Sequence, residues 1–244
     1  FFRDPETFEL VKTKVLPSLM ADRDPADPIR VWVIGCSTGE EAYSIAIMFS
    51  EYMEREGRAC AVQIFATDLN AMSVERARAG LYPKSIADRV TPERLRRYFH
   101  EIDGKYRVAK SIRDMCVFAK HDIAMDPPFS RMDLISCRNL LIYLEPVLQQ
   151  AVLPIMHYAL EPHGYLWLGG SETIGSYRDL FQLEDGKHKF YRRKPLSVRR
   201  PGDVVATERA VASREIGLPM VSVRKPSLPA ASDPQKEAER LLIA

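Results

Sequence analysis

Short apolar runs alternate with amphipathic segments along most of the chain. The run RVWVIG at 30–35 ends in a glycine, and apolar residues at helical spacing follow it. A second run, VQIFATD at 62–68, ends in an acid, and Asn70 then suits the cap of a helix that stops at Gly80. We therefore predict two successive β-to-α units. The apolar face of the first helix consists of Ala42, Ile45, Ala46, Phe49 and Met53.

Three further apolar runs continue the alternation. The predicted strands are MCVFAKHD at 115–122, MDLISC at 132–137 and GYLWLGG at 164–170, with a helix from about Pro146 to Leu160. Strands joined through helices pair in parallel, so the pattern predicts an α/β fold with a mostly parallel, doubly wound sheet. Ligands bind such sheets at the carboxyl ends of the strands, where the strand order reverses.

The interval 81–114 interrupts this alternation. It contains a helix-like segment, TPERLRRYF, a turn at Asp103-Gly104, and the segment KYRVAKSIRD at 105–114, for which we predict a small hairpin. We interpret the interval as a subdomain inserted beside the main sheet. Its excess of basic residues fits either an electrostatic docking patch or an ordinary solvated face. These residues are Lys84, Arg89, Arg94, Arg96, Arg97, Lys105, Arg107, Lys110 and Arg113.

A proline-rich stretch separates this pattern from the end of the chain. From 195 to 234 the apolar periodicity is lost and prolines accumulate, which is typical of a linker. The final segment, 235–244, returns to a helix-like pattern. We predict a main domain at 1–194, a linker at 195–234, and the start of a further helical segment at 235–244. Because the sequence begins at Phe1 rather than Met, we expect a piece of a longer protein.

Composition and charge argue against several function classes. The 244 residues carry a formal net charge of +2, which is not the basic excess of a nucleic-acid-binding domain. The four cysteines form no CxxC pair, so neither a zinc site nor a disulfide framework is expected. No apolar run reaches the roughly 18 residues that cross a bilayer. We expect a cytoplasmic protein without nucleic-acid binding or membrane insertion.

The loop VIGCSTGEE after the first predicted strand has features of a nucleoside-binding turn. Gly35 and Gly39 allow backbone amides close to a ligand, with Ser37 between them, but the spacing differs from the G-x-G-x-x-G that holds a pyrophosphate. Asp68 is placed to bind ribose hydroxyls, although it could serve only as a helix cap. A ligand with a ribose, an amino-acid end and no phosphate satisfies these features, and S-adenosylmethionine is such a ligand. Its amino-acid end suits Glu40 or Glu41.

The stretch DPPFSRMDLISCRN at 126–139 contains two competing signals. DPPF is the tetrapeptide with which amine-methylating enzymes hold a nitrogen acceptor, but in those enzymes it ends an apolar strand. Here the apolar run DLIS comes after DPPF. We interpret DPPF as a rigid turn that precedes the strand, and CRN at 137–139 as the part that reaches the site. Amine methylation remains the less favoured alternative.

Five blocks of sequence together resemble one family. In chain order they are FFRD (1–4), WVIGCSTGEEAYSIA (32–46), FATDLN (65–70), RYF (97–99) and FSRMDLISCRNLLIYL (129–144). These blocks are similar to the catalytic domain of CheR-type chemotaxis receptor methyltransferases. The resemblance implies a class I S-adenosylmethionine-dependent methyltransferase fold, Rossmann-like and doubly wound. It also implies glutamate side chains on the cytoplasmic helices of methyl-accepting chemoreceptors as the acceptor.

The resemblance also implies roles for individual residues. For the cofactor these are the turn of Gly35, Ser37 and Gly39, Glu41 at the amino group, Asp68 at the ribose, and Asp122 with Ile123 around the adenine. Arg138 and Asn139 are expected to line the cofactor and acceptor pocket. Arg3 is expected at the cofactor or substrate carboxylate and Tyr143 at the reacting carboxylate, which makes both candidate catalytic residues. The alternatives are an ordinary arginine near a chain end for Arg3 and a core aromatic for Tyr143.

Two departures from the family pattern affect the expected partners. The helical domain that precedes FFRD in the family is absent from this sequence, and only HEIDGK separates RYF from YRV. Family members that grip a receptor pentapeptide have a longer loop there, so we expect direct docking on the acceptor. The final segment resembles the connector in hybrids that fuse methylesterase, methyltransferase and PAS modules, and PAS/kinase modules are candidate fused partners. A scaffold that binds S-adenosylmethionine without catalysis is the alternative from another class.

Overall fold

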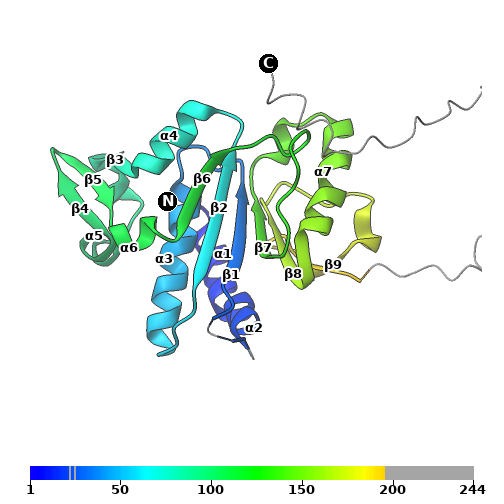
Figure 1. Ribbon diagram of the computed structural model, residues 1–244, viewed down its shortest axis with the longest axis horizontal. Helices are drawn as coiled ribbons and strands as arrows, with labels where there is room; N and C mark the ends of the chain where they lie inside the picture. The colour runs from blue at the N-terminus through cyan, green and yellow to red at the C-terminus, as the bar shows by residue number, and fades with distance from the viewer. Residues whose placement is uncertain (22, 25, 196–244) are drawn as a thin grey trace, which may run out of the picture. The chain divides into compact units, whose positions relative to one another are not determined.

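The computed structural model describes residues 1–21, 23–24 and 26–195 (Figure 1). The predicted linker, apart from its first residue, and the predicted terminal helical segment lie outside this range. The described part is built around one large sheet with helices on both faces and a smaller sheet that belongs to the inserted interval. No helix within it combines the length and the apolar character that a membrane crossing requires.

The large sheet has seven strands in the order β6-β2-β1-β7-β8-β10-β9. The first five strands of that order are parallel, and β10 runs antiparallel to both of its neighbours. The chain builds outward from β1 through β2 to β6 and then returns to the other side of β1 with β7, so the order reverses there. The strands are β1 (Ile29–Ile34), β2 (Val62–Asp68), β6 (Cys116–Lys120), β7 (Met132–Cys137), β8 (Leu160–Leu168), β9 (Phe181–Asp185) and β10 (Phe190–Arg193).

Alternation along β1 explains the two layers of helices. Val31 and Val33 pack in one buried cluster with the apolar face of α3 (Glu40–Arg55), whereas Trp32 lies in a second cluster with α7 (Pro146–Ala159). Successive side chains of a strand point to opposite faces, so a continuous apolar run is expected for a strand covered on both sides. The first cluster also includes the N-terminal helical stretch of α1 (Pro5–Leu10), a π-helical turn (Val11–Val15) and α2 (Leu16–Met20).

The predicted β-to-α units are confirmed, including the ends of the second helix. In α4 (Ala71–Ala79) the Oδ1 atom of Asn70 accepts from the backbone N–H groups of Met72 and Ser73, at 2.9 and 3.2 Å. Gly80 ends the helix in the left-handed conformation, with φ of 59°. The predicted strands around 115–122, 132–137 and 164–170 are also present, as is the helix before β8.

The inserted interval forms a three-stranded sheet in the order β3-β5-β4, and here one prediction was wrong. Residues 105–114 do not form a hairpin by themselves, because β5 pairs backward with β4 across the Asp103-Gly104 turn and the residues after β5 turn into a helix. The elements are β3 (Leu81–Pro83), a 3₁₀ turn (Lys84–Asp88), α5 (Pro92–Tyr98), β4 (Phe99–Ile102), β5 (Lys105–Val108) and α6 (Lys110–Arg113).

The predicted close approach of a ligand at Gly39 has a competing explanation in packing. A Cβ atom at Gly39 would lie 2.8 Å from the Cβ of Ala77 on α4, and Gly39 has φ of 92°. Gly57 also has a positive φ, of 62°, but nothing lies within 4 Å of its Cβ position. An alanine at Gly57 would therefore meet backbone strain alone, whereas an alanine at Gly39 would meet both backbone strain and steric crowding.

We predict that Gly39→Ala lowers the free energy of unfolding by about 1–3 kcal/mol more than Gly57→Ala. The left-handed conformation alone costs alanine about 1 kcal/mol, and overpacking adds about 1–3 kcal/mol at the crowded position. Urea denaturation of both variants measures the difference. Equal losses would show that crowding against Ala77 contributes nothing.

Candidate functional site

The predicted cofactor residues gather where β1, β2 and β7 end. A cleft of about 250 Å³ lies at this edge, and its lining includes Arg3, Gly35, Ser37, Glu40 and Glu41. Two parts of the chain that are far apart in sequence thus meet: the N-terminal residues, and the loop after β1 with the start of α3. This is the place where the strand order reverses, as expected for the ligand site of such a sheet.

Asp68 fastens the loop after β1 to the end of β2. Its Oδ2 atom accepts from the backbone N–H of Ser37 at 2.8 Å, and its Oδ1 atom accepts from the backbone N–H of Asn70 at 2.8 Å. Ser37 itself has φ of 48°. Asn70 is the cap of α4, so the alternative that Asp68 is merely a helix cap is wrong. Each carboxylate oxygen of Asp68 retains acceptor capacity for a ligand hydroxyl.

Arg138 and Glu41, predicted separately, form one ion pair, in which the Arg138 side chain is buried and that of Glu41 is half-buried. The Nη1 atom of Arg138 donates to Oε2 of Glu41 at 3.0 Å, and Nη2 donates to Asp4 Oδ2 at 2.7 Å and to the carbonyl oxygen of Arg3 at 3.0 Å. The Oγ of Ser136 donates to the other oxygen of Glu41 at 2.6 Å. The guanidinium therefore connects β7, α3 and the N-terminal segment. It lines a second cleft, of about 390 Å³, beside the first.

Burial changes the proton affinity of two groups in the first cleft. It raises the pKa of Glu41, an effect that the charge of Arg138 and the hydrogen bond from Ser136 counteract. Burial and the nearby charge of Asp68 raise the pKa of Cys36 to about 12. Cys36 is therefore a neutral thiol at neutral pH, which is not the ionised form that acts as a nucleophile. In the described part of the chain, no cluster of three His, Cys, Asp or Glu residues could hold a metal ion.

The remaining predicted residues lie around this edge without lining the first cleft. Asp122 and Ile123 follow β6, and the N–H of His121 donates to the carbonyl oxygen of Asp68 at 3.1 Å, which brings their loop beside the end of β2. Ile123 is half-buried against the cluster that contains Trp32. Asp122 accepts at its Oδ1 from the backbone N–H of Ala124.

Tyr143 is not a core residue. It ends a short 3₁₀ turn (Leu141–Tyr143) and is 79% exposed, so the core-aromatic alternative is wrong. Asn139, between Arg138 and this turn, has φ of 57°. Its backbone N–H donates to Glu172, a buried residue that the sequence analysis missed. In the sequence, the one sign that Glu172 belongs to the site is its place in GGSE, four residues after the apolar strand β8 ends.

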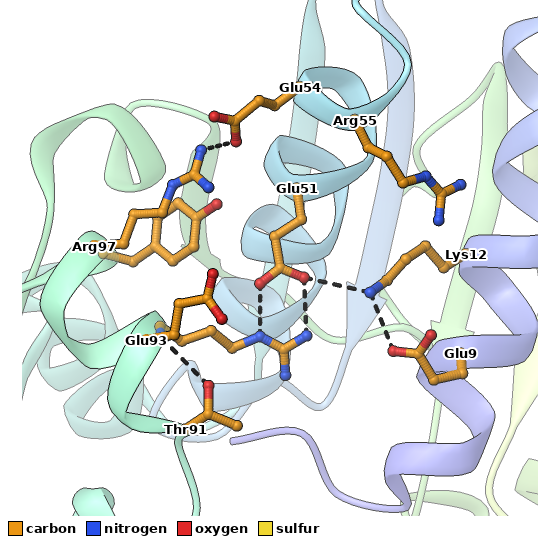
Figure 2. Close-up of a pocket in the computed structure, with 10 residues that line it drawn as sticks. Glu9, Lys12, Glu51, Glu54, Arg55, Thr91, Glu93 and Arg97 are labelled. Atoms are coloured by element: carbon orange, nitrogen blue, oxygen red, sulfur yellow. Dashed lines mark hydrogen bonds and ion pairs between the residues drawn. The ribbon is translucent and has the colours of Figure 1, made fainter.

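A further cleft, of about 560 Å³, lies elsewhere, between the N-terminal helical stretch, α3 and α5 (Figure 2). Its charged side chains pair mainly with one another. Arg94 of α5 forms a bidentate ion pair with Glu51 of α3, in which Nε and Nη2 donate to the two carboxylate oxygens at 2.7 and 2.8 Å. The Nζ atom of Lys12 donates to the same carboxylate at 3.4 Å. Burial alone would raise the pKa of Glu51, but Arg94 and Lys12 lower it below its ordinary value.

Arg94 also connects the inserted subdomain with the N-terminal segment. Its guanidinium lies 3.9 Å above the ring of Phe2, and the backbone N–H of Phe2 donates to the Oγ of Ser44 on α3 at 2.9 Å. The ring of Phe1 packs edge-on against Tyr82 and Phe99 of the subdomain. The segment that carries Arg3 is therefore held between α3 and the inserted subdomain.

The fold and the site together define a class I S-adenosylmethionine-dependent methyltransferase domain. Residues 1–190 match the model of the CheR methyltransferase SAM-binding domain. The chain belongs to this family, and S-adenosylmethionine is the cofactor of the matched domain. The cleft suits that cofactor chemically: it presents acids to the cofactor's cationic amino group, and Asp68 beside it retains acceptor capacity for a ribose.

Three relatives illustrate how much of a longer protein the chain covers. It is 40% identical over 230 residues to an uncharacterized 104.1 kDa protein encoded in the hypE 3′ region of Rhodobacter capsulatus, covering 92% of this chain and 24% of that protein. It is 39% identical to the putative methyltransferase Cher3 of Pseudomonas putida, over 74% of this chain and 67% of the relative. It is 36% identical to a chemotaxis protein methyltransferase of Vibrio parahaemolyticus, over 75% and 67%. The chain thus spans about a quarter of the first relative.

We predict that Arg94→Ala weakens binding of S-adenosylhomocysteine, the demethylated cofactor, by about fivefold. The variant loses a cation–π contact of about 1 kcal/mol on Phe2, so the segment that carries Arg3 is held less firmly. Calorimetry measures the dissociation constant. Arg96→Ala is the matched control, because Arg96 is exposed on the same helix. An unchanged constant in both variants would show that the contact does not reach the cleft.

Proposed function

We propose that this chain transfers the methyl group of S-adenosylmethionine to glutamate side-chain carboxylates of methyl-accepting chemoreceptors, as part of sensory adaptation. Residues 1–194 would be the catalytic domain, acting in the cytoplasm on the receptors' cytoplasmic helices. The observation that carries the proposal is the Arg138 ion-pair system, which joins the end of β7 to the two segments that line the first cleft. The family of the chain supports it, as does its similarity to a chemotaxis protein methyltransferase.

The proposed cofactor contacts follow the geometry of the first cleft. Asp68 would bind the ribose, and the turn of Gly35, Ser37 and Gly39 would approach the ligand with backbone atoms. Glu41 already binds Arg138 and Ser136, so we propose that it reaches the cofactor amino group while it keeps those partners. Asp122 and Ile123 would flank the adenine, and Arg138 with Asn139 would separate cofactor from acceptor.

The reaction would need alignment and exclusion of water rather than a base. A glutamate carboxylate has a reference pKa near 4.3, so it is already ionised at neutral pH. One of its oxygens would attack the methyl carbon in line with the breaking carbon–sulfur bond, and the sulfur would keep the electron pair as a neutral thioether. Water around an anion and a cation slows their reaction, so positioning and desolvation supply the catalysis.

Arg3 and Tyr143 are the proposed orienting groups for the carboxylates. Arg3 is exposed at the cleft, and its own carbonyl oxygen is fixed by Arg138, so its backbone is placed while its side chain is free to contact a ligand. The hydroxyl group of Tyr143 is available because the side chain is exposed. Too tight an ion pair with Arg3 would reduce the nucleophilicity of the acceptor.

The proposed function predicts base-labile methylation. Receptor membranes incubated with radiolabelled S-adenosylmethionine and the chain should gain label that alkali releases as methanol. Asp68→Asn, which weakens the proposed ribose contact, should lower the rate. Alkali-stable label would indicate an amine acceptor. Cofactor binding without transfer to any receptor would favour the scaffold alternative.

Arg3→Ala should lower activity through binding more than through chemistry. We expect KM to rise about tenfold or more, the equivalent of one charge-assisted hydrogen bond, with kcat changed much less. Arg3→Lys retains the charge and should recover part of the loss. A pure loss of turnover at saturating substrate would contradict this role.

Amine methylation stays a weaker alternative. The structure places DPPF at 126–129, before β7 begins at Met132, so the tetrapeptide does not end the strand. Phe129 instead packs against Trp32, Phe65 and His121, with ring centroids 5.1 to 5.4 Å apart. This segment therefore has a packing role at the approach to the strand.

A further inference from the structure

One buried carboxylate near the site binds only backbone N–H groups. Glu172 lies beyond the end of β8 and is 3% exposed. Its Oε2 atom accepts from the backbone N–H of Asn139 at 2.9 Å and of Gly169 at 2.6 Å, and its Oε1 atom accepts from the backbone N–H of Leu141 at 2.8 Å. A buried carboxylate is costly unless it is hydrogen-bonded, and these three bonds supply that stabilisation.

The contact is specific for a group that only accepts. All three partners are donors, and they reach both oxygens of Glu172. A glutamine of the same shape would direct an NH₂ group at one or two N–H donors, whichever way its amide is turned. An isosteric amide is therefore expected to leave backbone donors unpaired, and a buried unpaired donor costs about 1–3 kcal/mol.

The space around this carboxylate is closed by Gly169. A Cβ atom at Gly169 would lie 2.7 Å from Oε2 of Glu172 and 3.0 Å from the backbone nitrogen of Asn139. No side chain fits there without displacing the contact. Packing and hydrogen bonding, two independent features, thus preserve the same junction between the ends of β7 and β8.

The segment that Glu172 holds differs from the one that Arg138 holds. Arg138 is fixed by Glu41, Asp4 and the carbonyl oxygen of Arg3. The chain then passes through the left-handed conformation at Asn139 and enters the turn that ends in Tyr143. In this segment the backbone N–H groups that donate to Glu172 come after Arg138, at Asn139 and Leu141.

We infer that Glu172 is a positioning residue for methyl transfer, because it fixes Asn139 and the turn that presents Tyr143 to the acceptor. The inference rests on the proposed function. It assigns to GGSE the task of holding the acceptor side of the pocket, while the ion pairs of Arg138 hold the cofactor side. The two sides should therefore respond differently to substitution.

The test compares three substitutions of Glu172 in the chain as it stands. We expect kcat for receptor methylation to fall at least 50-fold in Glu172→Gln and Glu172→Ala, and less in Glu172→Asp, which still accepts but is shorter. The dissociation constant of S-adenosylhomocysteine should change less than fivefold in each variant. Glu145→Gln is the matched control, because Glu145 is exposed close to the same turn and makes no side-chain cap bond.

Hydrogen exchange provides a readout that does not depend on the acceptor. Peptides covering 138–143 and 169–172 should exchange faster in Glu172→Gln, whereas peptides from β1 and β2 stay protected. If Glu172→Gln is nearly as active as wild type, or if cofactor binding is lost along with turnover, the positioning role is wrong. If the wild-type chain methylates no receptor although the exchange pattern is as expected, the proposed function fails and the anchoring contact stands.

Discussion

The rest of the site depends on the buried guanidinium of Arg138. Its side chain is 2% exposed, and it lies 4.4 Å above the ring of Trp167. Removing one partner of a buried ion pair typically costs about 3–5 kcal/mol, because the remaining charge is left uncompensated. Here the partners lie on two other segments, so one side chain joins the end of β7 to α3 and to the N-terminal residues.

A second set of contacts extends this arrangement to the inserted subdomain. Arg94 stacks on Phe2, and the ring of Phe1 packs against Tyr82 and Phe99. Arg3 therefore follows two residues, Phe1 and Phe2, that contact the inserted subdomain on one side and α3 on the other. The sequence analysis interpreted the basic residues of the subdomain as either a docking patch or a solvated face. The structure adds a third role, because Arg94 and Arg97 form ion pairs with acids of α3.

Much of the fold could be predicted because periodicity and cap chemistry are local. Asn70 and Gly80 mark the ends of α4, and the apolar run at 62–68 coincides with β2. β9 and β10 were not predicted, since their residues are mixed in polarity and pair antiparallel at the edge of the sheet. The hairpin at 105–114 was misassigned because strand pairing is a non-local choice. Likewise, the sequence suggested both Glu41 and Arg138 but could not show that they bind each other across 97 positions.

Three of the carboxylates around the site share a pattern of hydrogen bonding. Asp68 and Glu172 accept mainly from backbone N–H groups, and Glu41 accepts from a serine and an arginine. Each is engaged with donors of the protein itself, so each organises a turn or a segment. That arrangement suits an acceptor that arrives already ionised. A nitrogen or hydroxyl group that accepts the methyl group would have to lose a proton. Such a reaction needs a base whose lone pair is not already engaged in hydrogen bonds.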